Sequence, residues 1–272
     1  MRLPDFIGVG PIRTATTWLH EELKDHVGLP LSKESRFFDW YYDRGIAWYA
    51  SYFRNCPSDR PIGEFCPTYF QRGDVLERIA GDIPRCKIIV TLRHPVERAY
   101  SQYKMLRHAA YLGDVTFEQA LILNPAIIDG SRYASHLIDW QKRFGKDRVL
   151  VCLYDDLRAD EEKYLARICD FIGVPPVRPV TLDKMTINSF DSPPKSPFLA
   201  RLALKIRLTL QNNEYYRSID LIDRAGFFEY CRGRGEKYPP VARDTANRLI
   251  DELRTEIDAL EKLIDRDLTA WK

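Results

Sequence analysis

Short apolar runs alternate along the chain with longer stretches in which apolar residues recur at helical spacing. Three runs are short and continuous, which predicts buried β-strands at residues 6–10, 87–92 and 148–154. The helical spacing predicts helices that begin at residue 16 and that cover 74–83, 95–107, 117–123, 133–144, 161–172, 198–210 and 243–265. Because strands and helices alternate, we predict an α/β protein with a central parallel sheet flanked by helices.

The spacing of these elements predicts a single domain over residues 1–272. Residues 36–54 are rich in aromatic side chains, which is typical of core packing. Residues 174–197 are rich in proline and have little periodicity, so we expect a long loop there. A C-terminal helical part follows at 198–272, and the basic residues of its first helix, 198–210, are expected to form a solvated helix face.

Bulk properties exclude several classes of function. The net charge is +2, so no strong field points to nucleic acid or to a membrane surface. No apolar run is long enough to span a membrane, and no signal-peptide core precedes the first strand. The six cysteines lack metal-ligand spacing. We therefore expect a cytoplasmic protein with no nucleic-acid partner, no membrane span and no metal; its oligomeric state is not predicted.

The loop between the first strand and the first helix, residues 10–17, has the makings of an anion site. Unpaired N–H groups and the dipole at a helix N-terminus favour negative charge. Arg13 adds a planar cation suited to phosphate or sulfate oxygens, and threonines add hydroxyl donors. The Gly-Lys pair of a Walker A loop is missing. Alone, the loop fits equally a turn with a threonine helix cap, acids in the first turns of the helix and a surface arginine.

A second candidate anion element follows the strand at 87–92. Arg93 comes directly after this strand, and carboxyl ends of parallel strands gather at one edge of a sheet. Ser101 lies eight residues further on, about two turns into the next helix, and could join Arg93 on a second phosphate. The alternative for Arg93 is a surface salt bridge, for instance with Glu97. Together the two elements favour a ligand with two phosphate groups.

With these two elements in place, the chain resembles the sulfotransferases that use 3′-phosphoadenosine 5′-phosphosulfate (PAPS), in particular their heparan-sulfate-type (carbohydrate) branch. The resemblance rests on both anion elements and on the segments 33–40, 45–49, 64–70, 133–140 and 235–241. It covers residues 5–175 well and the tail loosely. It implies a P-loop-like sulfotransferase fold and transfer of a sulfuryl group from PAPS to a hydroxyl or amine, leaving 3′-phosphoadenosine 5′-phosphate (PAP). The implied acceptor is a carbohydrate or a small metabolite.

The resemblance also implies a role for individual residues. Glu34 matches the catalytic base of that branch, and Arg13 would stabilise the transferring group. The residues implied in binding PAPS are Arg13, Thr14, Ala15, Thr16, Thr17, Trp18, Arg93, Ser101, Arg234, Gly235 and Lys237. Those implied in contacting the acceptor are Arg36, Trp40, Tyr69 and Tyr133.

The sequence departs from the family pattern at several positions, and two other functions stay open. The departures are Arg13 for lysine, Ala15 for glycine, Arg36 for histidine, Phe65 for lysine and Glu236 for a cation. The first four changes argue against a heavily sulfated acceptor, and Ala15, Arg36 and Phe65 would also suit a non-catalytic protein that binds a nucleotide or glycan. A nucleotide-dependent kinase is the other alternative, because 149–156 is similar to a Walker B strand ending in acids that could hold Mg²⁺.

Overall fold

The computed structural model describes residues 2–30, 33–180, 190–212, 215–227, 230 and 236–272. They pack as two compact units. The first consists of Met1–Arg98, Asp129–Asn188 and Arg248–Lys272, and the second consists of Ala99–Ile128 and Ser189–Asn247. This division concerns packing, and the single domain over 1–272 remains a prediction.

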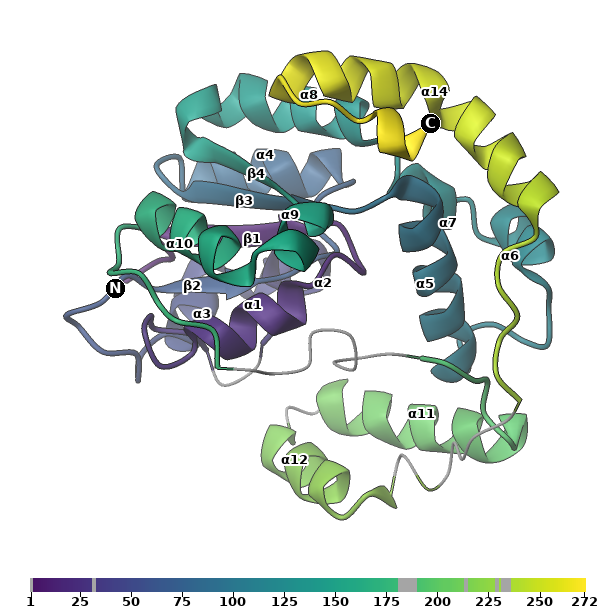
Figure 1. Cartoon of the computed structure of the whole chain (residues 1–272). Helices are drawn as coiled ribbons and strands as arrows, with labels where there is room; N and C mark the ends of the chain where they lie inside the picture. The colour runs from purple at the N-terminus through teal and green to yellow at the C-terminus, as the bar shows by residue number, and fades with distance from the viewer. Residues whose placement is uncertain (1, 31–32, 181–189, 213–214, 228–229, 231–235) are drawn as a thin grey trace. The chain divides into compact units, whose positions relative to one another are not determined.

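A parallel sheet forms the centre of the first unit (Figure 1). Its strands among the described residues are β1 (Phe6–Gly10), β2 (Gly63–Phe65), β3 (Lys87–Leu92) and β4 (Val149–Leu153), in the order β2-β1-β3-β4. The predicted parallel sheet is therefore confirmed. Because β1 lies between β2 and β3, the loop after β1 opens beside the carboxyl ends of both neighbours.

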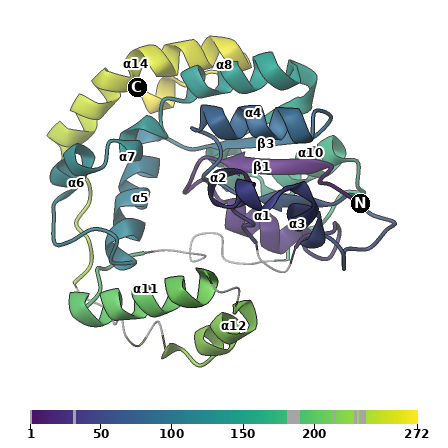
Figure 2. The same cartoon turned by 180° about the vertical axis from the view of Figure 1, so that it is seen from behind.

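Helices cover both faces of this sheet, as predicted (Figures 1 and 2). One face carries α1 (Thr16–Leu23) and α10 (Glu161–Ile172), whose apolar sides share one core cluster with Phe6 and Ile89. The other face carries α4 (Gly73–Asp82) and α8 (Tyr133–Phe144), and α8 contacts β3 and β4. The final helix, α14 (Arg243–Ile264), joins α8 through an ion pair between Arg132 and Glu252 at 2.8 Å.

Short elements connect the strands within the first unit. The aromatic segment after α1 forms α2 (Phe37–Trp40), the 3-10 turn η1 (Tyr42–Arg44) and α3 (Ile46–Ser51). Its predicted core packing is confirmed for Phe37, Phe38 and Tyr49, which are fully buried, whereas Trp40 is 52% exposed. The 3-10 turn η2 (Lys146–Arg148) precedes β4, α9 (Tyr154–Ala159) follows it, and the 3-10 turn η3 (Thr269–Trp271) ends the chain.

The second unit is helical. Helix α5 (Pro95–His108) enters it at Ala99, and α6 (Phe117–Leu123), α7 (Ala126–Asp129), α11 (Pro197–Asn212) and α12 (Tyr216–Arg224) follow. The rings of Tyr100, Tyr103 and Phe117 pack together between α5 and α6. Helices α11 and α12 pack on each other around Ala203.

Two further findings concern the part of the chain that the structure describes. Within it, no helix has the length and apolar character needed to cross a bilayer. The five cysteines located there are Cys56, Cys66, Cys86, Cys152 and Cys169, and all carry free thiols.

Strand β2 contains an acid in the core. Glu64 is fully buried, and the hydroxyl of Tyr49 donates a hydrogen bond to its Oε1 at 2.8 Å. Removal of the carboxylate from water raises the pKa of Glu64 to about 7. The folded protein therefore binds a proton here that the unfolded chain, with its ordinary carboxyl pKa, releases above about pH 4.5.

This difference predicts a pH-dependent stability. As the pH rises from about 5 to 8, the wild type should lose on the order of 2 kcal/mol of its free energy of unfolding relative to Glu64→Gln, because only the wild type must ionise a buried acid. Urea unfolding of both proteins at pH 5, 6.5 and 8 measures it. Glu77→Gln, at a largely exposed acid that pairs with Arg143, is the control for an acid outside the core. A constant difference between wild type and Glu64→Gln would contradict the account.

Candidate functional site

The loop after β1 is pinned to β3 by a buried threonine. The hydroxyl of Thr14 donates to the backbone oxygen of Pro11 at 2.6 Å, so the hydroxyl of Thr91 donates to Thr14 Oγ1, also at 2.6 Å. Arg13 and Ala15, on either side, have left-handed backbone conformations with φ of 74° and 70°. Residues 13–15 thus alternate between left-handed and ordinary backbone conformations. This alternation turns successive N–H groups toward one concave side, which commonly binds an anion.

The predicted threonine cap of α1 is wrong. The cap position is Ala15, and no side chain accepts a hydrogen bond there. Thr14 is committed to Pro11 and Thr91, and Thr16 already lies inside the helix. The first turn of α1 holds no acid, and the acids predicted for the first turns, Glu21 and Glu22, lie in the second turn. The N-terminus of α1 therefore keeps its dipole and N–H groups without a carboxylate or hydroxyl cap, as an anion-binding helix end requires.

Three cations gather at this edge of the sheet: Arg13, Lys33 and Arg93. Burial, and then the charge of Arg93, lowers the pKa of Arg13 to about 10, which still leaves it protonated at neutral pH. The pKa of Lys33 is also lowered, mainly by burial and in part by the charge of Arg13. Like charges that perturb one another in a partly buried place are stabilised by a bound anion.

Lys33 is a site residue that sequence reasoning missed. Its Nζ donates to Thr17 Oγ1 at 2.6 Å and lies 3.5 Å from Glu34 Oε1. It therefore joins the phosphate loop to the predicted catalytic base. The available signal was its position next to Glu34 in the segment 33–40, where only the acid was given a role.

Arg93 makes the surface ion pair that the sequence left open. Its Nη2 lies 2.8 Å from Glu97 Oε2, and its guanidinium lies over the ring of Tyr154 at 4.8 Å. The hydroxyl of Tyr133 donates to the backbone oxygen of Arg93 at 2.7 Å. Because Glu97 is about half exposed, the pair contributes little to stability. Arg93 can exchange this carboxylate for a phosphate at small cost.

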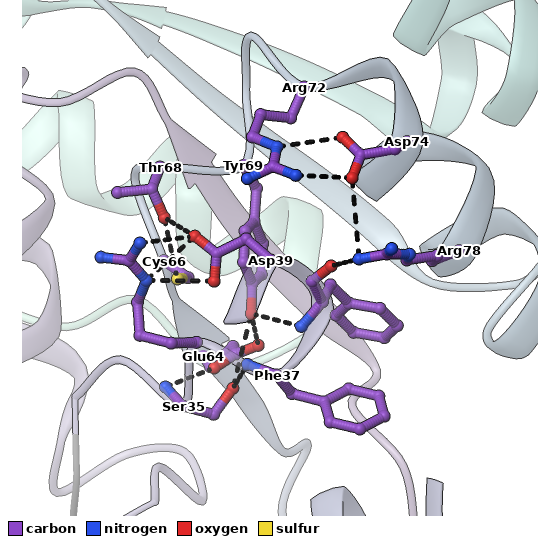
Figure 3. Close-up of polar contacts among 12 residues, drawn as sticks. Ser35, Phe37, Asp39, Glu64, Cys66, Thr68, Tyr69, Arg72, Asp74 and Arg78 are labelled. Atoms are coloured by element: carbon purple, nitrogen blue, oxygen red, sulfur yellow. Dashed lines mark hydrogen bonds and ion pairs between the residues drawn. The ribbon is translucent and has the colours of Figure 1, made fainter. Parts of the chain in front are cut away.

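A buried network holds the backbone next to Glu34 (Figure 3). Glu64 Oε2 accepts a hydrogen bond from the Ser35 N–H at 3.1 Å, and the Tyr69 hydroxyl donates to Glu64 Oε1 at 3.4 Å. The same Tyr69 hydroxyl accepts a bond from the Phe38 N–H at 3.3 Å. The segment that carries Glu34 is thereby tied to β2 and to the residues that follow it.

Arg36 and Trp40 form a flat pair two and six residues beyond Glu34. The Arg36 guanidinium lies 3.8 Å from the centre of the Trp40 ring, a cation–π geometry. Its Nη2 lies 2.7 Å from Oδ2 of Asp39, whose side chain is 1% exposed. The Thr68 hydroxyl donates to the same Asp39 oxygen at 2.8 Å (Figure 3). Arg36 is thus held in a fixed orientation beside an exposed indole.

Other predicted site residues lie in different surroundings. Tyr69 and Tyr133 are almost fully buried and bond to protein groups, so their contact with an acceptor remains a prediction. Ser101 is buried on α5 in the second unit, and its pairing with Arg93 also remains a prediction. Arg234 and Gly235 lie outside the described residues, and Lys237 is exposed.

The acids that suggested a kinase are engaged in structural contacts. Asp155 Oδ2 accepts a hydrogen bond from Trp271 Nε1 at 2.9 Å, and Asp156 forms an ion pair with Arg266 at 2.8 Å. Both aspartates lie in the first turn of α9, where acids stabilise a helix N-terminus. Within the ranges that the structure covers, no cluster of three His, Cys, Asp or Glu residues is arranged to hold a metal ion.

Comparison with known proteins points to one family. Residues 47–179 match a model described as the sulfotransferase family. Human bifunctional heparan sulfate N-deacetylase/N-sulfotransferase 2 is 31% identical over 97% of this chain, which spans 30% of that protein. Mouse heparan sulfate glucosamine 3-O-sulfotransferase 6 is 30% identical over 64% of this chain and 53% of its own length. The chain thus spans only a third to a half of these relatives.

A solved structure agrees with this result at the level of the fold. A sulfotransferase from Alicyclobacillus acidocaldarius superimposes with a TM-score of 0.70, covering 100% of this chain and 99% of its own, at 20% identity. The predicted sulfotransferase fold is therefore confirmed. On the family match and on these relatives, the chain is similar to the PAPS-dependent sulfotransferases, and in particular to their heparan-sulfate branch.

Proposed function

We propose that the chain transfers a sulfuryl group from PAPS to a hydroxyl or amine of an acceptor. One observation carries the proposal: Arg13, Lys33 and Arg93 are gathered, partly buried, at the edge of the sheet where β1 and β3 end. Arginine and lysine in this number match the oxygens of a phosphosulfate group and of a second phosphate. The uncapped start of α1 adds N–H donors to the same place.

The residues present fit PAPS, with one part of the site for each end of the molecule. The loop from Arg13 to Trp18 and the side chain of Lys33 would hold the 5′-phosphosulfate end. Arg93 would hold the 3′-phosphate, with Ser101 as its predicted partner. PAPS, when bound, supplies an activated sulfuryl group. Arg13 and Lys33 would stabilise the negative charge that builds on the oxygens around it, because they are already oriented in a partly buried place.

Glu34 would act as the general base and take the proton of the acceptor hydroxyl or amine. Its carboxylate lies 3.5 Å from Lys33 Nζ, and Lys33 in turn bonds to Thr17 in the phosphate loop. The base and the cations are therefore linked by direct contacts within the first unit. A base with this link can remove the proton at the place where the sulfuryl group is held.

The acceptor that we propose is a glucosamine-containing glycan or a related polyol. Two relatives act on heparan sulfate according to their names. The stacked pair of Arg36 and the exposed Trp40 offers a flat apolar surface close in sequence to Glu34, and sugar rings pack on such surfaces. Because Asp39 already neutralises Arg36, this pair adds little net positive charge for a heavily sulfated chain.

Removal of one cation should weaken PAP binding selectively. Arg93→Ala should raise the Kd of PAP roughly 10- to 100-fold, because a charge-assisted bond contributes about 1.5–3 kcal/mol. Ser101→Ala should raise it by roughly 10-fold at most. Isothermal titration without magnesium measures both, beside ADP, which lacks the 3′-phosphate. Arg143→Ala, at an exposed pair with Glu77, is the control and should bind as the wild type does. An affinity for ADP equal to that for PAP, or binding that requires magnesium, would favour the kinase alternative.

Neutralising the base should separate turnover from binding. Glu34→Gln should lower kcat roughly 100-fold or more, since a positioned general base contributes about 10²- to 10⁴-fold. Its affinity for PAP should stay within about threefold of the wild type, because the cations are intact. Release of PAP from PAPS with an unsulfated glucosamine oligosaccharide measures the rate. An unchanged rate would refute the base role, and PAP binding without turnover in the wild type would favour the non-catalytic alternative.

A further inference from the structure

Glu64 is the one acid of strand β2, and three donors converge on its carboxylate. The Ser35 N–H donates to Oε2 at 3.1 Å, while the hydroxyls of Tyr49 and Tyr69 donate to Oε1 at 2.8 and 3.4 Å. Figure 3 shows the Glu64 carboxylate beside Ser35. These donors come from three separate places: the turn before α2, helix α3 and the loop after β2.

A buried acid is a costly way to fill this space. Glu64 is fully buried, and an apolar residue of similar volume in its place would avoid the desolvation of a carboxylate. An apolar side chain, however, leaves the Ser35 N–H without its acceptor in the core. A buried N–H that loses its partner is destabilising, and the chain would shift to satisfy it. What the acid adds is therefore a defined position for the backbone at Ser35.

That position matters because Ser35 follows Glu34 directly. On the N-terminal side of this residue pair, the Glu34 carboxylate contacts Lys33, and Lys33 in turn bonds to Thr17 in the phosphate loop. On the other side, Arg36 has a left-handed backbone with φ of 56°, so the chain turns sharply before α2. The Ser35 N–H bond to Glu64 fixes the peptide that lies between these two constraints.

We propose that Glu64 is a positioning residue, a buried anchor that sets the orientation of Glu34 by holding the Ser35 N–H. The inference rests on the proposed role of Glu34 as the base. Glu64 touches neither donor nor acceptor in this account. Its effect reaches the reaction through one peptide group, and a small displacement of a reacting group is enough to lower a rate substantially.

Two conservative variants of Glu64 separate the effect of its side-chain length from the effect of its carboxyl group. Glu64→Asp keeps the carboxyl group but shortens the side chain, so the bond to Ser35 is lost; kcat should fall roughly 10- to 100-fold. Glu64→Gln keeps the length and a carbonyl acceptor for the N–H, so kcat should stay within about threefold. Both should keep the KM for PAPS and the Kd for PAP within about threefold of the wild type. PAP release from PAPS with an unsulfated glucosamine oligosaccharide gives the rates.

The matched control is Arg78→Ala, which removes a 2.6 Å bond to the backbone oxygen of Phe38 in the same helix α2. It should lower stability and leave kcat unchanged within about twofold. If Arg78→Ala and both Glu64 variants lower kcat and PAP affinity together, the acid is only structural and the proposal is overturned. A Glu64→Asp rate equal to that of the wild type overturns it as well.

Hydrogen exchange of the segment 33–40 tests the anchor without any acceptor. Glu64→Asp should speed exchange at Ser35 by roughly 10-fold or more relative to Glu64→Gln, because only the shortened side chain releases the amide. Unchanged exchange overturns the proposal. A rate that falls in Glu34→Gln but not in Glu64→Asp overturns the positioning role alone, whereas a rate unchanged in Glu34→Gln overturns the proposed function.

Discussion

Mutual repulsion among Arg13, Lys33 and Arg93 is the constraint around which this edge of the sheet is organised. Cations in a partly buried place oppose folding unless the backbone holds them there and an anion can neutralise them. The hydrogen bond from Thr91 to Thr14 helps to fix the backbone that carries these cations, because it joins the loop of Arg13 to the strand that leads to Arg93. The parallel order of β1 and β3 brings both strand ends to one edge.

The site is supported from two sides by different kinds of interaction. The donor side relies on charge: cations, a helix dipole and backbone N–H groups at the ends of β1 and β3. The side of the base relies on a buried hydrogen-bond network around Glu64, which belongs to β2. Lys33 connects the two sides, because it contacts both Thr17 and Glu34. Affinity for the donor and alignment of the base can therefore change independently.

The sequence predicted the fold where apolar periodicity was strong and failed where it was weak. Strand β3 and helices α6, α8 and α10 lie where the pattern predicted them. Strand β2 was missed because its three residues are Gly, Glu and Phe, which form no apolar run. Helix α12 lies within the predicted C-terminal helical part, but its bounds were not predicted. The predicted threonine cap failed because the Thr14 hydroxyl bonds to Pro11 and Thr91, and Thr91 lies 77 residues away.

In the candidate site, too, local sequence patterns identified some residues and long-range contacts determined the role of others. Arg13, Glu34 and Arg93 could be named from local motifs and from the family resemblance, and the structure gathers their segments in one unit. Lys33 and Glu64 lie within segments 33–40 and 64–70 of the resemblance, but the sequence alone predicts no role for either. Their importance depends on contacts with Thr17 and Ser35, which are 16 and 29 residues away and carry no sequence signal.

A crystal structure of the full chain bound to PAP tests the central claim most directly. The account predicts that the 5′-phosphate lies against Arg13, Lys33 and the start of α1, and that the 3′-phosphate contacts Arg93 in place of Glu97. PAP bound elsewhere, or bound at this edge without contact to these three cations, would contradict it.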